Sequence, residues 1–407
     1  MSVIVQKFGG TSVSDENGRR HVLRHIVRER EAGRGLVVVV SAMGRRGDPY
    51  ATDTLLDLIR QNGDALPDRE KDLLLSCGEI ISAATLTSLL LAEGIPAAAL
   101  TGGQAGIITD ARFGSARILE VRPDAVQSLL DEGKVVVVAG FQGRTEDGEI
   151  TTLGRGGSDT SATALGAALH AEVVDIFTDV DGILTADPRI VEDARPLPVV
   201  SYEEIAHMAN NGARVIHPRA VEIAMKAGVP VRVRSTFSDG EGTLVTFSEK
   251  ARSRPGWMDR TVTGLAHFPG VTQISIAAEG GSQDLQLQVF RSMAVNGISV
   301  DLISVMPSGV HYTVKEADTP KAVRILEELG FKPKVRTGCA KVSVIGGGMN
   351  GVPGVMAQIV EALTSRRINI LQSADSNTTI WVLVSEEDMA EALKALHAQF
   401  GLHLAPN

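Results

Sequence analysis

The stretch KVVVVAGFQGRTEDGEITTLGRGGSDTSATALGAALHAEVVDIFT, residues 134–178, decides the fold class. It opens with an apolar run at 134–139 (KVVVVA) and closes with a second predicted strand at 172–178 (EVVDIFT), and the Ala-rich segment 158–169 between them predicts a helix. Continuous apolar runs are typical of strands buried on both faces, and a helix between two such strands indicates a parallel crossover. We therefore predict an α/β fold with a mainly parallel sheet.

The same alternation extends in both directions from this stretch. Further predicted strands lie at 3–6, 36–41, 97–101 and 230–235, and predicted helices lie at 15–32 and 68–93. An edge strand is expected near 243–247. The charged segment SEKARSRPGWMDRT at 248–261 then indicates a domain boundary, so the first domain is assigned to residues 1–250.

An internal repeat follows this boundary at an offset of 70 residues. Val289-Phe290 align with Ile359-Val360, and Tyr312-Thr313-Val314 align with Val382-Leu383-Val384. Each unit predicts strand, helix, strand, strand, helix, which indicates two similar small α/β modules at 262–337 and 338–407. Chance similarity between two α/β segments is the alternative.

Composition excludes several classes of protein. The chain has 407 residues, of which 43% are hydrophobic, and its net charge of −9 argues against general nucleic-acid binding. Cys77 and Cys339 form no CxxC motif, which argues against a zinc site or a disulfide scaffold. The N-terminus lacks a signal peptide's apolar core and no uninterrupted apolar run reaches about 18 residues, so we expect a cytoplasmic protein without membrane contact.

Two glycine-rich turns precede predicted helices. Lys7-Phe8-Gly9-Gly10-Thr11-Ser12 follows the first strand, and 152–161 (TLGRGGSDTS) opens the helix at 158–169. Glycines let a backbone approach a ligand closely, and a helix N-terminus favours an anion. The guanidinium group of Arg155 can donate two parallel hydrogen bonds to a carboxylate. Two such turns in one sheet predict sites for a polyphosphate and a second anionic substrate. An ordinary tight loop and a plain N-cap by Ser158 or Asp159 remain the alternatives.

Two further features add polar chemistry to this sheet. The segment 175–189 (DIFTDVDGILTADPR) lies at the C-terminal end of a predicted strand. A calcium loop starting at Asp179 is excluded, because its fifth and twelfth positions are Ile183 and Ile190, which cannot be ligands. The segment instead predicts a nucleotide-binding loop or a solvated Asp-rich loop. Glu79 lies in the apolar stretch DLLLSCGEIISAATL, where its carboxylate needs a partner: a substrate ammonium or a protein arginine. The P-loop, protein-kinase, GxSxG and HExxH motifs are missing.

Together, KFGGTSV, LLLSCGEIIS, GRGGSDTSATALGAAL and VDIFTDVDGILTADPRIV resemble the aspartate kinases of the amino-acid kinase fold, and the tail resembles their paired ACT modules. The resemblance covers essentially the whole chain. It implies a three-layer sandwich over residues 1–250, followed by two ferredoxin-like βαββαβ ACT modules. The long loop SAMGRRGDPYATDTLL is similar to that of the diaminopimelate-sensitive subgroup.

The resemblance implies transfer of the ATP γ-phosphoryl group to the side-chain carboxylate of L-aspartate, giving 4-phospho-L-aspartate. This is the first step toward lysine, diaminopimelate, threonine and methionine. Mg²⁺ would bridge phosphate oxygens, and no all-protein metal site is implied. Another amino-acid kinase, acting on glutamate or acetylglutamate, and a non-catalytic amino-acid sensor are the alternatives.

The resemblance also implies site residues. Lys7 and Asp159 would be catalytic. The aspartate pocket would consist of Thr52, Glu79, Phe141, Arg155, Gly156, Gly157 and Ser158. The nucleotide site would consist of Lys7, Phe8, Gly9, Gly10, Ser41, Thr178, Asp179, Leu184, Thr185, Ala186, Asp187, Pro188 and Arg189.

The regulatory half of the resemblance is less complete. Ser235-Thr236-Phe237 stand where some family members have a lysine, so no second catalytic lysine is assigned. The first ACT module lacks the usual Pro-Gly turn, which the second keeps as Val352-Pro353-Gly354, and Asp301 is the candidate partner for an effector ammonium. The expected effectors are diaminopimelate first, lysine second and threonine last. A homodimer through the ACT modules is expected, with a separate regulatory subunit starting at Met258 as an alternative.

Overall fold

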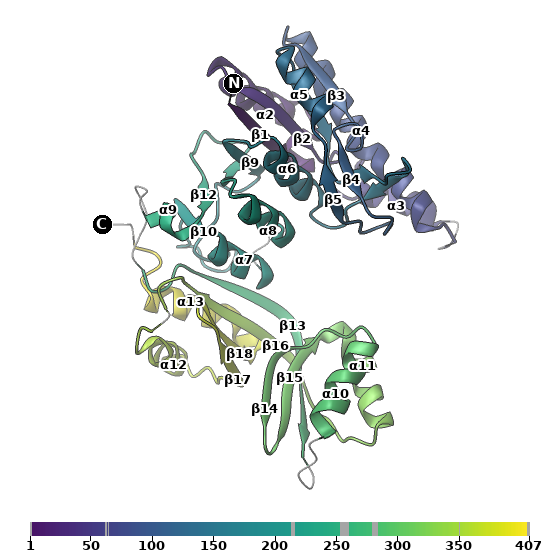
Figure 1. Ribbon diagram of the computed structural model, residues 1–407. Helices are drawn as coiled ribbons and strands as arrows, with labels where there is room; N and C mark the ends of the chain where they lie inside the picture. Colours follow the sequence, from purple (N-terminus) through teal and green to yellow (C-terminus); the bar gives the residue numbers. More distant parts are fainter. Residues whose placement is uncertain are drawn as a thin grey trace. The chain divides into compact units, whose positions relative to one another are not determined.

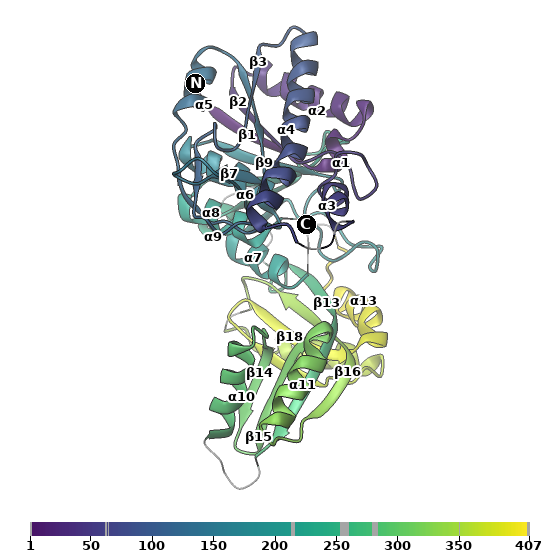
Figure 2. The same ribbon diagram turned by 90° about the vertical axis from the view of Figure 1, so that its right-hand side faces the viewer.

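Figures 1 and 2 show a computed structural model of the chain in two orientations, which describes residues 2–61, 63, 65–212, 216–252, 260–278, 284–349 and 351–404. The chain forms two compact units. The first comprises Met1–Ile183, Pro196–Ala209 and Arg214–Trp257, and the second comprises Leu184–Arg195, Asn210–Ala213 and Met258–Asn407. Met258, where a separate subunit was considered, lies outside the described residues.

The first unit is built on an eight-stranded sheet with the order β10-β12-β11-β9-β1-β2-β6-β3 (Figure 1). At its centre, β1 (Val3–Phe8) pairs in parallel with β2 (Gly35–Val40) and with β9 (Val173–Thr178). Strand β6 (Val135–Ala139) lies parallel between β2 and β3 (Ala97–Leu100). The predicted parallel α/β sheet is confirmed.

Helices cover both faces of this sheet. On one face, α2 (Glu16–Glu31) and α4 (Asp68–Ala92) pack their apolar side chains against alternate residues of β1, β2, β6 and β9. The intervening residues point to the other face, where α5 (Asp124–Asp131) and α6 (Gly157–Ala168) contact the same strands. This gives the three layers that the resemblance implied.

One predicted strand position is wrong. Strand β12 (Thr243–Thr246) is not at the edge of the sheet, because β10 (Val199–Ser201) pairs with it in parallel on its outer side. On its inner side β12 runs antiparallel to β11 (Val231–Ser235). Strand β10 has three residues, which is too short for a periodicity signal.

A second, four-stranded sheet was not predicted. Its order is β5-β4-β7-β8, with β4 at Ile107–Thr109, β5 at Ile118–Val121, β7 at Gln142–Arg144 and β8 at Ile150–Thr152. Each strand has three or four residues, and such a short segment has no run of apolar residues long enough to predict a strand from the sequence. This small sheet matters for the site because β8 leads directly into residues 153–157.

Helix α4 is long and apolar enough to cross a membrane when judged by length and composition only. Half of the most apolar part of this helix is buried, and Leu86 and Leu90 pack in the core beside Leu36 and Val135. The helix also carries two buried carboxyl groups, those of Asp72 and Glu79. These features are those of a core helix.

The second unit contains a six-stranded antiparallel sheet with the order β14-β15-β13-β16-β18-β17, whose strands are labelled in Figure 1. The predicted repeat is confirmed, because equivalent elements recur at the predicted offset. Strand β15 (Gly309–Lys315) corresponds to β18 (Thr379–Ser385), and the helix start at Thr319 corresponds to that at Met389. The helices α10 (Asp284–Val295) and α12 (Val355–Ser365), together with α11 (Thr319–Glu328) and α13 (Met389–Gln399), complete the two copies.

The two repeats share their central strands, β13 (Gly264–Ala277) and β16 (Lys334–Ile345). The first half of β13, Gly264–Phe268, pairs with Lys341–Ile345, which in turn pairs with β18. The second half of β13, from Val271, pairs with β15. Residues 264–268 therefore extend the sheet of the second repeat, although they precede the first repeat in the sequence.

The segment Leu184–Arg195 packs with the second unit, although it lies within the predicted first domain. Ala186 and Val191 are buried in the same core as Val342, Ile359 and Leu396. Thr185 is also buried, and its hydroxyl lies 2.9 Å from His397 Nε2 of α13. The sequence between β9 and β10 thus contributes to the core of the second repeat.

Candidate active site

Several predicted site residues of the first unit lie at the carboxyl edge of its sheet. Strands β1, β2, β6 and β9 are neighbours, and they end at Phe8, Val40, Ala139 and Thr178. The loops that follow them contain Gly9, Gly10, Ser41 and Phe141, all of which were predicted site residues. Ligands of open α/β sheets bind outside this edge, where the chain connections diverge to opposite sides.

Lys7 and Asp159 form an ion pair at this edge. Lys7 Nζ lies 2.8 Å from Asp159 Oδ1, and each side chain is 13% exposed. The other carboxylate oxygen, Oδ2, accepts only a long contact of 3.4 Å from the backbone N–H of His217. The structure therefore brings together, from β1 and the first turn of α6, the two residues predicted to be catalytic.

The turn after β1 is packed too tightly for any residue but glycine at position 10. A Cβ on Gly10 would lie 2.5 Å from the carbonyl oxygen of Ala42, and the Gly10 carbonyl accepts a 3.0 Å hydrogen bond from Gly44 N–H. Ser41 N–H donates to the carbonyl of Phe8 at 3.1 Å. The loops after β1 and β2 are consequently held against each other beside Lys7.

Glu79 is a buried carboxyl group with one unsatisfied oxygen. The residue is 2% exposed, and its Oε1 accepts a 3.0 Å hydrogen bond from Ala42 N–H. Its Oε2 has no partner among the described residues. The predicted alternative of a protein arginine is therefore not realised, because no arginine of the described residues pairs with Glu79. Burial raises the pKa of Glu79 to about 8, against the opposing effect of the Ala42 N–H. An external cation would satisfy this group.

Arg155 lies in a loop shaped by three glycines. Its side chain is exposed and makes no hydrogen bond or ion pair with the rest of the described chain. Gly156 has a φ of 71°, and a Cβ there would lie 2.2 Å from the ring of His217. A Cβ on Gly157 would lie 2.7 Å from the ring of Phe141. The glycines thus allow the backbone next to Arg155 to pack closely against the rings of His217 and Phe141, while the Arg155 guanidinium group stays free.

Phe141 has an unusual backbone conformation, with a φ of 68°. Its N–H donates to Ser161 Oγ at 3.1 Å and its carbonyl accepts from Leu153 N–H at 2.8 Å, which hold this conformation in place. A bulky residue in the left-handed region is strained, and such strain concentrates at functional sites. The other pocket candidates are Ser158, which is buried behind Gly140, and Thr52, the first residue of α3 (Thr52–Arg60).

The predicted nucleotide-binding residues divide between the two units. Thr178 and Asp179 lie at the end of β9 in the first unit, where the Thr178 hydroxyl donates to Asp179 Oδ1 at 3.1 Å and Arg45 pairs with Asp179 Oδ2 at 3.3 Å. Residues 184–189 belong to the second unit. There Thr185 and Ala186 are buried, and Asp187 pairs with Arg189 at 2.6 Å, which holds the pKa of Asp187 below its usual range. A nucleotide role for these six residues stays a prediction.

Sequence reasoning missed His217, which contacts the site. Its Nδ1 accepts from the Arg219 N–H and caps α8 (Pro218–Ala227), while its ring lies against Gly156. Burial lowers the pKa of His217, although the nearby Asp159 carboxylate opposes this effect. The signal in the sequence is His217-Pro218, a capping residue followed by proline at the first position of a helix.

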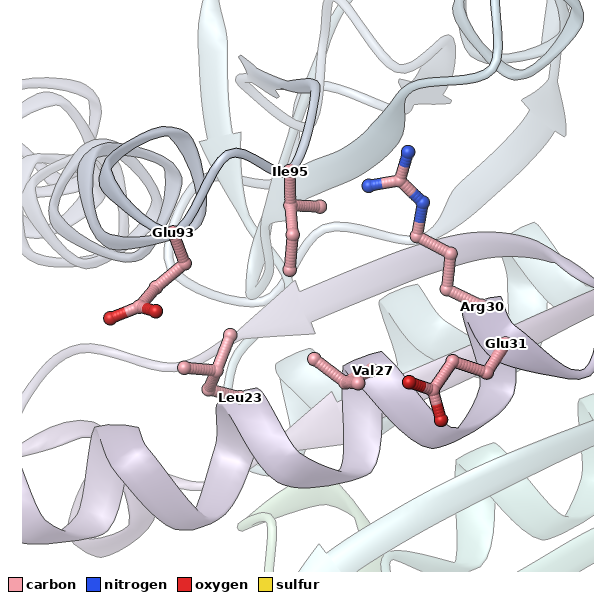
Figure 3. A pocket seen from close by; sticks show the side chains of 6 residues that line it. All are labelled: Leu23, Val27, Arg30, Glu31, Glu93 and Ile95. Atoms are coloured by element: carbon pink, nitrogen blue, oxygen red, sulfur yellow. The ribbon is translucent and has the colours of Figure 1, made fainter.

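An apolar groove elsewhere on the first unit contains none of the predicted residues (Figure 3). Leu23 and Val27 of α2 face Ile95 across it, and three charged side chains surround them: Arg30, Glu31 and Glu93. Its lining offers no counterpart to the convergent polar groups around Lys7. We therefore assign the candidate site from the chemistry of its residues and not from this groove.

Comparison with known proteins identifies the family of this chain. The model of the amino acid kinase family matches residues 2–235, and an ACT domain model matches residues 334–398. Aspartokinase 1 of Bacillus subtilis is 56% identical over 402 residues, which cover 99% of this chain and 100% of that protein. The chain belongs to the aspartokinase family.

Other aspartokinases extend this result. The aspartokinase of Thermus thermophilus is 42% identical over 416 residues, with both chains covered completely. The crystal structure of E. coli aspartokinase III in complex with aspartate and ADP has a TM-score of 0.80 at 27% identity, covering 98% of this chain and 100% of that one. The predicted fold class and family are confirmed, and the chain is an ATP-dependent phosphotransferase with an ACT region.

Proposed function

We propose that this aspartokinase transfers the γ-phosphoryl group of ATP to the side-chain carboxylate of L-aspartate, giving 4-phospho-L-aspartate. The product would enter the pathway toward lysine, diaminopimelate, threonine and methionine, in the cytoplasm. The observation that carries the proposal is the buried Glu79 carboxyl group, whose Oε2 lacks a partner among the described residues. An amino acid with a free ammonium group satisfies this carboxyl group, whereas an N-acetylated amino acid has no positive charge on its nitrogen.

The clamp on aspartate would have two ends. Glu79 would bind the ammonium group, and the free guanidinium of Arg155 would bind the α-carboxylate with two hydrogen bonds. The substrate's side-chain carboxylate is ionised at pH 7, so the reaction needs no general base. Catalysis then consists of alignment and charge neutralisation, and Lys7 would neutralise the charge that develops on the phosphoryl oxygens.

The fold family implies Mg²⁺ together with ATP. Carboxylate oxygens are the hard ligands that this ion prefers, and Asp159 presents one at the same edge as Lys7. The residue that would hold the ion is therefore Asp159, with phosphate oxygens as the other ligands. Bound there, Mg²⁺ would supply charge neutralisation for the transferred group.

The replacement Arg155→Ala tests the proposed function. We expect the KM for aspartate to rise by about 10–100-fold, because a charge-assisted double hydrogen bond is lost, while the KM for ATP changes little. Steady-state kinetics with each substrate varied in turn gives the result. Arg122→Ala, which removes an exposed arginine paired with Glu120 and Glu146, is the matched control. Unchanged aspartate kinetics in Arg155→Ala would remove the assigned role.

We also propose that the ACT region carries feedback regulation, with diaminopimelate, lysine and threonine as effectors in that order, in a homodimer. The crystal structure of E. coli aspartokinase III with lysine and aspartate, at a TM-score of 0.75 and 27% identity, supports an amino-acid effector. Within the second unit, the candidate residue Asp301 pairs with the largely buried Lys341. An effector ammonium would compete with Lys341 for this carboxylate.

An inhibition assay tests this regulation. One of the three amino acids should inhibit the wild-type enzyme, and Asp301→Ala should raise its half-inhibiting concentration by about tenfold, the loss of one charge-assisted hydrogen bond. The control Asp375→Ala removes an exposed carboxylate from β17 (Gln372–Asp375) and should leave inhibition unchanged. Equal sensitivity of wild type and Asp301→Ala would exclude Asp301 from the effector site.

A further inference from the structure

Two charged side chains that the proposed reaction does not use lie beneath the Arg155 loop. The first is Asp72, which is fully buried on α4, the helix that also carries Glu79. Its carboxylate accepts hydrogen bonds from Gly114 N–H at 2.9 Å, from Thr152 N–H at 2.8 Å and from the Thr152 hydroxyl at 2.6 Å. Asp72 therefore joins α4 to two backbone segments that are distant in the sequence.

The second is Arg219 on α8, which is partly buried. Its Nη1 donates to the carbonyl of Leu153 at 3.1 Å, and its Nη2 donates to the carbonyl of Ala116 at 2.9 Å. The two segments that it joins also bond to each other, because Ala116 N–H donates to the Thr152 carbonyl at 2.8 Å. Burial lowers the pKa of Arg219 from its ordinary value.

Asp72 and Arg219 thus hold the same two segments, 114–116 and 152–153, through opposite kinds of backbone group. Asp72 accepts from their N–H groups, and Arg219 donates to their carbonyl groups. Buried charges are costly unless hydrogen bonds satisfy them, and this arrangement satisfies both. We name these two side chains the Asp72–Arg219 brace.

The brace supports the residue that precedes Arg155. Gly154 has a φ of 74°, and a Cβ there would lie 3.3 Å from the Gly114 carbonyl oxygen and 3.3 Å from Ser115 Oγ. Gly154 consequently packs against the braced segment 114–116 and directly follows the braced segment 152–153 in the chain. A shift of either segment would move the backbone from which the Arg155 side chain extends.

We infer that Asp72 and Arg219 are positioning residues that fix Arg155 relative to the helix carrying Glu79, and so set selectivity for an amino acid that has an α-carboxylate as well as an ammonium group. The inference rests on the proposed function, in which Arg155 binds that carboxylate. A purely structural role for the brace would instead lower the amount of folded enzyme and affect all substrates equally.

The test compares Asp72→Asn and Arg219→Gln with two matched controls, Asp68→Asn and Arg122→Gln, which change exposed residues. Both brace variants should raise the KM for aspartate by about tenfold or more, since each leaves buried groups unsatisfied, and should change the KM for ATP by less than about twofold. The inhibition constant of β-alanine, which is aspartate without its α-carboxylate, should stay within about twofold of wild type. Both controls should match wild type.

A double-variant cycle separates this inference from the proposed function. If the brace acts through Arg155, adding Asp72→Asn to Arg155→Ala should not raise the aspartate KM further. Additive effects, or equal losses for aspartate and β-alanine, would overturn the inference while leaving the proposed function intact. A normal aspartate KM in Arg155→Ala alone would instead overturn the proposed function.

A milder pair of variants covers the case in which Asp72→Asn fails to fold. Thr152→Val removes only the 2.6 Å hydrogen bond from the hydroxyl to Asp72, and Thr152→Ser keeps it. The valine variant should raise the KM for aspartate by about threefold or more, and the serine variant should restore the wild-type value. Equal values for the two variants would contradict the inference.

Discussion

Replacing Lys7 by methionine should lower kcat by about a thousandfold, the upper end of the effect of removing one preorganised group that stabilises transition-state charge. Lys7 Nζ lies 2.8 Å from Asp159 at the carboxyl edge of the sheet, and its side chain is 13% exposed. An ammonium group in such a site interacts strongly with developing phosphoryl charge because little water screens it. Methionine keeps the unbranched shape and removes the charge.

Steady-state kinetics and thermal unfolding together check this expectation. The KM for aspartate should change by only a few fold, because Lys7 belongs to the phosphoryl end of the proposed site. Lys134→Met, which removes a partly exposed lysine paired with Glu132, should behave as wild type. A kcat for Lys7→Met within about tenfold of wild type, with the protein folded, would exclude Lys7 from transition-state stabilisation.

Replacing Glu79 by glutamine should raise the KM for aspartate by about a hundredfold or more, because the ammonium group would lose its buried counter-charge. The wild-type enzyme should also show a pH dependence that the variant lacks. With a pKa of about 8, the ligand-free carboxyl group carries a proton at pH 7, and binding of an ammonium group requires its loss. Aspartate affinity should therefore rise by about tenfold per pH unit up to pH 8 and then level off.

The same substitution should stabilise the ligand-free protein in alkaline solution. The folded state binds one more proton than the unfolded state between the ordinary pKa of 4.5 and about 8, so Glu79 makes stability fall as pH rises through this window. Glutamine has no such proton to lose, and Glu79→Gln should exceed wild type at pH 8 by a few kcal/mol in the free energy of unfolding. Denaturant unfolding at pH 5 and pH 8 measures the difference.

Glu93→Gln is the control for both measurements, since Glu93 ends the same helix in an exposed position. It should leave the KM, the pH profile and the free energy of unfolding unchanged. An aspartate KM that does not depend on pH in the wild type would contradict the proposed role of Glu79, even if Glu79→Gln were inactive.

Much of the fold could be predicted from the sequence because the central strands are buried on both faces. Runs such as 134–139 and 172–178 can be recognised without any knowledge of their neighbours. The repeat at an offset of 70 residues was equally visible, since each copy conserves the same order of elements. Shorter strands such as β10 and β4 carry no comparable pattern, and they form only because longer strands and helices hold them.

The candidate site was predictable where a single segment carries the chemistry, as in Lys7 with its glycines or Glu79 in its apolar helix. What escaped prediction depends on contacts between distant residues. Asp72 meets Thr152 across 80 positions and Arg219 meets Leu153 across 66, and no local pattern marks either contact. The left-handed conformation of Phe141 was equally invisible, because it is imposed by Ser161 and Leu153.

The place of residues 184–195 limits how this chain can be divided or recombined. A cut between 250 and 260 would leave Ala186 and Val191 on the N-terminal fragment, stripped of the side chains that cover them. The C-terminal fragment would lose part of its own interior, and Thr185 would no longer face His397. A chimera that borrows the regulatory tail of a relative must therefore borrow this short upstream segment as well, because residues 184–195 and the tail share one core although they are far apart in the sequence.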